Sequence, residues 1–138
     1  MKKTILTYGT FDLFHIGHIR LLKRLKELGD ELIVAVSTDD FNKIKGKSSF
    51  FSFEERKEII SGCKYVDRVI EENSWEQKIG DIKKYEVSIF AIGDDWKGKF
   101  DYLNDYCDVV YLERTNDIST TLIRKRLSSI NHDDLSKL

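Results

Sequence analysis

Residues 8–18 read Tyr8-Gly9-Thr10-Phe11-Asp12-Leu13-Phe14-His15-Ile16-Gly17-His18. This stretch follows an apolar segment and precedes an amphipathic one, which predicts a strand, a tight glycine turn and the start of a helix. His15 and His18 are three residues apart and therefore share one face of that helix. A helix start also offers unpaired backbone N–H groups and the positive end of the helix dipole. These features together predict a binding site for an anion such as a phosphate.

The length and composition of the chain limit the classes of protein to which it can belong. With 138 residues, it is long enough for one domain and too short for two of ordinary size. The 23 basic and 24 acidic residues leave a net charge of -1, which gives no electrostatic basis for binding nucleic acid or an anionic membrane. The N-terminus lacks the apolar region of a signal peptide, and no apolar run reaches the ~18 residues of a membrane span. We therefore expect a cytoplasmic protein.

The sequence gives no pattern typical of a metal site. Cys63 and Cys107 lie outside any Cys-x-x-Cys spacing, which favours buried free thiols over a disulfide or a ligand pair. His15 and His18 are an alternative start for a zinc site, but the third histidine, His132, lies in the polar C-terminal tail. We therefore predict no metal bound by protein ligands alone.

Apolar runs alternate with helical patterns along the chain. The runs predict strands over 5–8, 32–36, 66–70, 87–92 and 109–112. Helical spacing predicts helices over 19–28, 53–62, 75–85 and 119–127, the last with Leu122, Ile123 and Leu127 facing inward. Nearly continuous apolar strands joined through helices are typical of a parallel sheet covered on both faces. We predict an α/β, Rossmann-like doubly wound sheet of about five strands in the order 3-2-1-4-5 over residues 1–127, followed by a tail over 128–138.

Two motifs in this pattern resemble those of a known superfamily. Residues 9–12 followed by His15, Gly17 and His18 look like the first motif of the nucleotidyltransferases with the His-x-Gly-His signature, and residues 118–121 look like the second. Residues 75–78, 93–101 and 111–115 further resemble segments of the glycerol-3-phosphate cytidylyltransferases. The similarity extends from Lys3 to about Arg126, so the chain is identified as a member of that family.

The resemblance implies a reaction of CTP with sn-glycerol 3-phosphate to give CDP-glycerol and pyrophosphate by direct in-line attack on the α-phosphate. It also implies Mg²⁺ held mainly by the CTP phosphates, a homodimer, and a product that feeds teichoic acid or capsule-type polymer synthesis. The acceptor phosphate has a second pKa of about 6 and attacks without a general base, which agrees with the absence of paired carboxylates from the motifs.

The motifs assign residues to three roles. The expected catalytic residues are His15, His18, Lys45 and Arg114. The expected nucleotide-binding residues are Gly9, Thr10, Phe11, His15, Gly17, His18, Lys45, Asp95, Arg114, Thr115, Ile118, Ser119, Thr120 and Thr121. The expected acceptor-binding residues are Lys47, Lys78, Arg56, Lys64 and Trp75.

Several of these residues also have a structural interpretation. Lys45 and Lys47 lie between residues 38 and 52, the longest stretch without a core pattern, and lysines in such a loop are commonly solvated. Ser119 suits a helix N-cap, a role that is compatible with phosphate binding. Trp75 suits aromatic packing, and Arg114 suits a pair with a neighbouring carboxylate.

The chain departs from the family pattern at two places. Lys64 stands where relatives commonly have arginine, which replaces a bidentate phosphate contact with a point charge. Asn116 and Asp117 stand where relatives usually have Glu-Gly, which places a carboxylate before the second motif. These departures keep open a sister transferase that uses ATP or another phosphorylated acceptor, and a nucleotide-binding module without catalysis.

Overall fold

The computed structural model describes residues 2–113 and 119–129. Five parallel strands form one sheet in the order β3-β2-β1-β4-β5, which confirms the predicted α/β class and strand order. The strands are β1 (Thr4–Gly9), β2 (Glu31–Ser37), β3 (Arg68–Glu72), β4 (Ile89–Gly93) and β5 (Asp108–Leu112). The chain order reverses on either side of β1, so the carboxyl end of β1 is the switch point at which ligands bind in such sheets.

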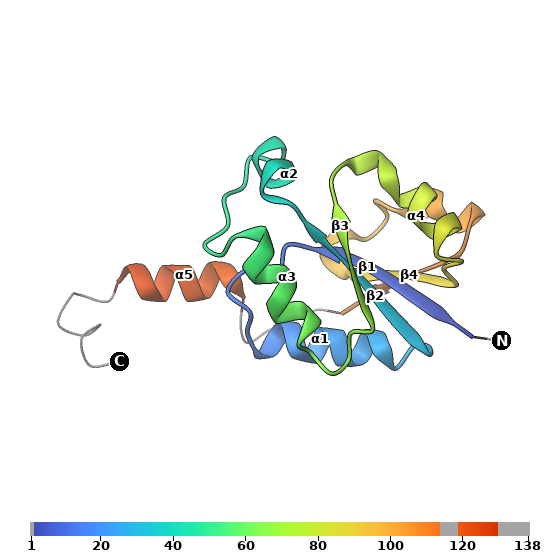
Figure 1. The fold of residues 1–138 in the computed structure, drawn as a ribbon, viewed down its shortest axis with the longest axis horizontal. Helices are drawn as coiled ribbons and strands as arrows, with labels where there is room; N and C mark the ends of the chain where they lie inside the picture. The colour runs from blue at the N-terminus through green and yellow to red at the C-terminus, as the bar shows by residue number, and fades with distance from the viewer. Residues whose placement is uncertain (1, 114–118, 130–138) are drawn as a thin grey trace.

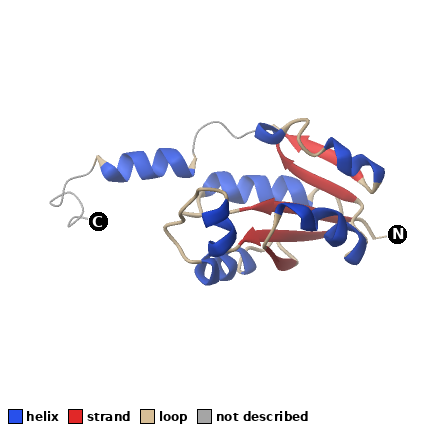
Figure 2. Cartoon of the chain, turned by 90° about the horizontal axis from the view of Figure 1, so that it is seen from above, coloured by secondary structure: helices blue, strands red, loops and turns tan. Residues whose placement is uncertain are grey.

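Helices cover both faces of this sheet (Figures 1 and 2). Helices α1 (Ile16–Lys26) and α3 (Phe53–Ser61) pack on one face, and α4 (Lys78–Lys84) with the short helix η3 (Asp101–Asp105) packs on the other. The remaining helices are α2 (Asp39–Ile44), η1 (Trp75–Gln77), η2 (Asp94–Trp96) and α5 (Thr120–Ser128).

Alternation along β1 divides the core into two layers. Ile5 faces the layer that contains Leu22 of α1 and Ile60 of α3, whereas its neighbour Leu6 faces the layer that contains Ile82 of α4. All four side chains are buried. Because successive strand residues point to opposite faces, an apolar run on a central strand fills both layers at once.

The structure corrects the sequence prediction at three elements. The stretch from 38 to 52 is not entirely loop: Thr38 caps α2 by accepting a hydrogen bond from Phe41 N–H, and the Phe41 ring anchors this short helix in the core. The single helix predicted over 75–85 consists of η1 followed by α4. Leu127 does not face inward but is exposed, because α5 extends away from the body of the molecule (Figures 1 and 2).

Cys63 and Cys107 are free, as predicted, but only half-buried. Cys63 follows α3, and Cys107 immediately precedes β5. Among residues 2–113 and 119–129, no helix combines the length and the apolar composition that a bilayer crossing needs.

Substitutions at two glycines are expected to change the stability of the fold in opposite directions. A Cβ on Gly29 would lie 2.8 Å from the backbone oxygen of Lys3, whereas a Cβ on Gly80 inside α4 would meet no atom within 4 Å. Gly29→Ala should lower the free energy of unfolding by about 1–3 kcal/mol because backbone must shift. Gly80→Ala should raise it by up to about 1 kcal/mol because alanine is the better helix former. Urea unfolding of both variants checks the pair, and equal effects would contradict the close approach at Gly29.

Candidate active site

Two adjoining cavities lie at the carboxyl ends of the strands. Their volumes are about 600 Å³ and 280 Å³, and His18, Thr120 and Thr121 contribute to the walls of both. The larger cavity also brings together the predicted residues Gly9, Thr10, Phe11, Lys45, Lys47, Trp75 and Lys78. The smaller cavity brings together His15, Gly17, Asp95 and Ser119.

The two histidines cap the helix on which they lie. The Gly17 N–H donates to His15 Nδ1 at 3.0 Å, and the His15 N–H donates to His18 Nδ1 at 3.2 Å. The imidazole rings stack with their centroids 3.8 Å apart. Because each Nδ1 accepts a hydrogen bond, each neutral ring carries its proton on Nε2. Both histidines therefore present an Nε2–H donor.

Burial keeps these imidazoles neutral. Desolvation, with a smaller contribution from the His15 ring, lowers the pKa of His18 to about 3. Desolvation also lowers the pKa of His15. The buried Nε2 atom of His15 has no hydrogen-bond partner among the described residues. A buried donor without a partner is costly, so this N–H is suited to a ligand oxygen.

The loop before these histidines has a strained backbone. Phe11 and Leu13 adopt positive φ angles of 53° and 50°, a conformation that costs energy for residues with a side chain. Gly9 lies close to this loop, since an added Cβ would come 2.6 Å from the Phe11 ring. The surrounding contacts must therefore hold the loop in place.

Asp12 supplies many of those contacts. Its buried carboxylate accepts hydrogen bonds from the backbone N–H groups of Phe50 and Phe51 at 2.6 and 3.0 Å and pairs with Arg124 of α5. These donors lower the pKa of the Asp12 carboxyl, although burial acts in the opposite direction. Thr120 donates to the Asp12 carbonyl oxygen at 2.8 Å. Asp12 thus joins the histidine loop, the segment before α3 and the start of α5.

Sequence reasoning missed Arg124, which also lies in the wall of the larger cavity. A signal was available, because Arg124 is one helical turn after Thr120 and so shares its face of α5.

A buried carboxylate links two of the predicted lysines. Glu72, the last residue of β3, lies with its oxygens 3.4 Å from Lys78 Nζ and 3.8 Å from Lys45 Nζ. Desolvation raises the pKa of Glu72 and lowers the pKa of Lys45, while the charges of the opposite sign act against both shifts. Sequence reasoning did not identify Glu72, because only the fold brings it between these lysines.

Aromatic rings surround the same lysines. Lys78 Nζ lies 4.5 Å from the Tyr8 ring centroid, 5.2 Å from that of Phe100 and 5.4 Å from that of Trp75. A cation over several ring faces is stabilised by their quadrupoles. This wall of the larger cavity therefore combines positive charge with apolar surface.

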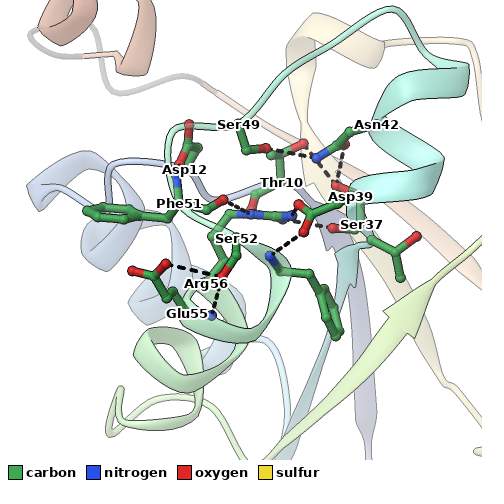
Figure 3. Close-up of polar contacts among 12 residues, drawn as sticks. Thr10, Asp12, Ser37, Asp39, Asn42, Ser49, Phe51, Ser52, Glu55 and Arg56 are labelled. Carbon is green, nitrogen blue, oxygen red and sulfur yellow. Dashed lines mark hydrogen bonds and ion pairs between the residues drawn. The ribbon is translucent and has the colours of Figure 1, made fainter.

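Arg56, predicted to bind the acceptor, is instead a buried structural residue. Its guanidinium donates to the carbonyl oxygens of Thr10, Ser37 and Phe51 and to the Asp39 carboxylate at 2.7–3.1 Å (Figure 3). The side chain is 0% exposed and is absent from both cavity walls. Its donors are satisfied within the protein, so Arg56 holds the loops around the site in place.

Lys64 lies far from the predicted acceptor site. It is exposed in the turn that leads from α3 to the amino end of β3, whereas the cavities lie at the carboxyl ends. Its Nζ packs 5.2 Å from the centroid of the neighbouring Tyr65 ring. The lysine that stands at position 64 in place of the family's arginine therefore does not line the cavity of this chain. The predicted residues Arg114, Thr115 and Ile118 lie outside the described residues, as do Asn116 and Asp117.

Comparison with known proteins identifies the class of protein that has this fold and these paired histidines. The cytidylyltransferase-like family model matches residues 6–126. Among solved structures, the lipopolysaccharide core biosynthesis protein of Thermoplasma volcanium superposes with a TM-score of 0.72 at 30% identity, over 83% of this chain and 98% of that one. This chain is thus a cytidylyltransferase-like protein.

Relatives with a higher sequence identity show the family within this class. The chain is 58% identical over 130 residues to the glycerol-3-phosphate cytidylyltransferase of Bacillus spizizenii, an alignment that covers 94% of this chain and 100% of the relative. It is 53% identical over 125 residues to the glycerol-3-phosphate cytidylyltransferase of Staphylococcus aureus, which covers 91% of this chain and 95% of the relative. The chain belongs to the glycerol-3-phosphate cytidylyltransferase family.

Replacing the buried guanidinium should destabilise the fold. In Arg56→Lys, one ammonium group cannot reach all four acceptors, which leaves buried carbonyl oxygens unpaired. We expect a loss of about 2–4 kcal/mol in the free energy of unfolding, measured by urea titration. Lys57→Ala, on the next residue of α3, should change it by no more than about 0.5 kcal/mol. A loss in Arg56→Lys as small as that control would contradict the structural role.

The depressed pKa of His18 predicts a pH-dependent stability. The unfolded chain takes up a proton near the ordinary pKa of 6.5, whereas the folded chain does so only at about 3. Lowering the pH from 7 to 5 therefore favours unfolding, by up to about 2 kcal/mol for this residue. His18→Asn keeps an acceptor for the His15 N–H and removes the titration. Urea unfolding at both pH values should show a smaller loss for the variant, and equal losses would disprove the depressed pKa.

Proposed function

We propose that this protein condenses CTP with sn-glycerol 3-phosphate to give CDP-glycerol and pyrophosphate. The glycerol-3-phosphate cytidylyltransferases that match nearly the whole chain support this activity. The observation that carries it within the structure is the pair of neutral histidines whose Nδ1 atoms are both occupied by backbone N–H groups. Two fixed Nε2–H donors beside a cavity with buried lysines suit a reaction between two phosphates.

In this reaction an oxygen of the acceptor phosphate forms a bond to the α-phosphorus of CTP. The bond from that phosphorus to the bridging oxygen of the β-phosphate breaks, and pyrophosphate leaves with the electron pair. The acceptor phosphate is ionised at neutral pH, so no proton has to be removed before attack. The protein chiefly aligns the two phosphates and stabilises the charge that develops between them.

The histidines act at the atoms that gain charge. His15 and His18 donate from Nε2 to the α-phosphate and to the bridging oxygen of the leaving pyrophosphate. Because burial keeps both rings neutral, they serve as hydrogen-bond donors and not as general acids. Gly17, between them, adds no Cβ where the nucleotide approaches the backbone.

The start of α5 binds the β- and γ-phosphates. The Thr120 hydroxyl already donates to the Asp12 carbonyl oxygen, so Thr120 contributes its backbone N–H. The Ser119 hydroxyl accepts from the Leu122 N–H and keeps its own hydrogen for a phosphate oxygen. Thr121 is exposed and offers both groups. Arg114, Thr115 and Ile118 complete the nucleotide site together with Gly9, Thr10, Phe11, Asp95 and Lys45, and the Lys45 ammonium group lies between the nucleotide and the acceptor phosphate.

Lysines bind the acceptor phosphate. Lys47 and Lys78 lie in the wall of the larger cavity with Lys45 and Trp75. The ammonium groups of Lys45 and Lys78 are held on either side of Glu72 and so point into one region of that wall. Two fixed cations suit a compact dianion.

Mg²⁺ enters this site as part of the nucleotide substrate. Among the described residues, no group of three or more His, Cys, Asp or Glu side chains is arranged to hold a metal ion. The carboxylates in the wall of the larger cavity, Asp12 and Glu72, are engaged by Arg124 and by two lysines. Mg²⁺ binds readily through phosphate oxygens and water, so we assign its ligands to CTP.

We further propose a cytoplasmic homodimer whose product is an activated glycerol phosphate donor for a teichoic acid or a capsule-type polymer. Large apolar side chains at Ile44 and Phe50 are 71% and 74% exposed, and Leu127 is also exposed. Such surface supports burial by a second copy of the chain.

Pyrophosphate release tests the proposed reaction. We expect release that requires CTP and sn-glycerol 3-phosphate together, in the presence of Mg²⁺, and little release with ATP or choline phosphate. His15→Ala and His18→Ala should each lower kcat by about 100-fold or more while the circular dichroism spectrum is retained. Turnover with another pair of substrates would indicate a sister transferase, and binding of CTP without any turnover would indicate a nucleotide-binding module.

A further inference from the structure

Glu72 lies where a bound acceptor would meet the protein. It ends β3 at the edge of the sheet, its own residue is 3% exposed, and it forms part of the wall of the larger cavity. Its backbone oxygen accepts a hydrogen bond from the Thr38 N–H at 3.0 Å, which fixes the end of the strand against the start of α2. The carboxylate therefore has a defined position.

The carboxylate of Glu72 has longer and fewer polar contacts than a buried charge usually has. Of its two lysine contacts, the one to Lys78 at 3.4 Å is a long hydrogen bond and the one to Lys45 at 3.8 Å is an ion pair alone. Among the described residues, no other group donates to its side chain. A buried carboxylate is normally satisfied by several donors. Glu72 thus has unused capacity to accept hydrogen bonds on the cavity side.

The other carboxylate of this cavity wall has little such capacity. Asp12 accepts from two backbone N–H groups and from Arg124. An acceptor molecule with free hydroxyls needs hydrogen-bond acceptors, which lysines and aromatic rings do not offer. Of the two carboxylates in this wall, Glu72 is the one that lies beside the lysines and can meet this need.

We propose that Glu72 is a specificity-determining residue that accepts hydrogen bonds from the free hydroxyls of the phosphorylated acceptor, while Lys45 and Lys78 bind its phosphate. This inference rests on the proposed function. It assigns the acceptor to the class of phosphates whose alcohol part is an uncharged polyol. The two lysines lie beside the carboxylate and also neutralise the incoming phosphate, so both anions are tolerated in one cavity.

The same arrangement disfavours a phosphorylated alcohol without free hydroxyls. Such an acceptor would leave the buried Glu72 carboxylate without further hydrogen-bond donors on the cavity side.

The test compares two acceptors on the same enzyme. Steady-state kcat/KM is measured with saturating CTP for sn-glycerol 3-phosphate and for propyl phosphate, which has the same carbon chain and phosphate without the hydroxyls. For the wild-type chain we expect a preference of about 100-fold or more for sn-glycerol 3-phosphate. In Glu72→Gln and Glu72→Ala this preference should fall by about tenfold or more. Because both acceptors are measured on one preparation, a partly unfolded variant does not alter the ratio.

Glu71→Gln is the matched control, since Glu71 is exposed on the same strand and lies in neither cavity wall. It should keep the wild-type preference. Equal losses for both acceptors in the Glu72 variants would show that Glu72 only positions the lysines, and would overturn the inference while leaving the proposed reaction intact. Failure of the wild-type chain to use sn-glycerol 3-phosphate with CTP would instead overturn the proposed function and this inference with it.

Discussion

The site depends on one buried guanidinium. Arg56 bonds to the carbonyl oxygens of Thr10 and Ser37, which follow β1 and end β2, and to that of Phe51 just before α3. The Thr10 and Phe51 carbonyl groups lie outside the strands, and that of Ser37 lies at the last residue pair of β2 and β3. Buried carbonyl groups at such places need donors from outside the sheet. A single planar cation with several N–H groups satisfies them together. The loops that carry the histidines and the lysines are consequently fixed relative to the sheet before any substrate binds.

Hydrogen bonds to segments distant in sequence also explain how the loop before the two histidines tolerates its backbone strain. Positive φ angles at Phe11 and Leu13 place Asp12 between the segment before α3 and the start of α5. Such conformations persist where many contacts determine them. Burial then removes the positive charge from the imidazoles, and capping leaves each with one outward donor. Preorganised donors of this kind need no reorganisation when charge develops on a phosphate.

Most of the fold follows from local patterns. The apolar runs predicted five strands and their parallel order, because strands buried on both faces must be apolar throughout and because the connections between them are helical. Helix α2 was missed, since six residues with one apolar anchor, Phe41, give no helical period to detect. The outward course of α5 was also missed, because the spacing of Leu127 indicates an apolar face but not what covers it.

For the site, the sequence alone determined the residues whose partners are close in the chain. His15 and His18 bond within one helical turn, so their spacing was sufficient to predict an anion site. Tertiary structure decided the rest. It buried Arg56 and brought Glu72 between two lysines from other elements. It also placed Lys64 before the amino end of β3, at the opposite end of the strands from the cavities. A charge acquires its role from the groups and the solvent around it, and for these side chains both are supplied by segments distant in sequence.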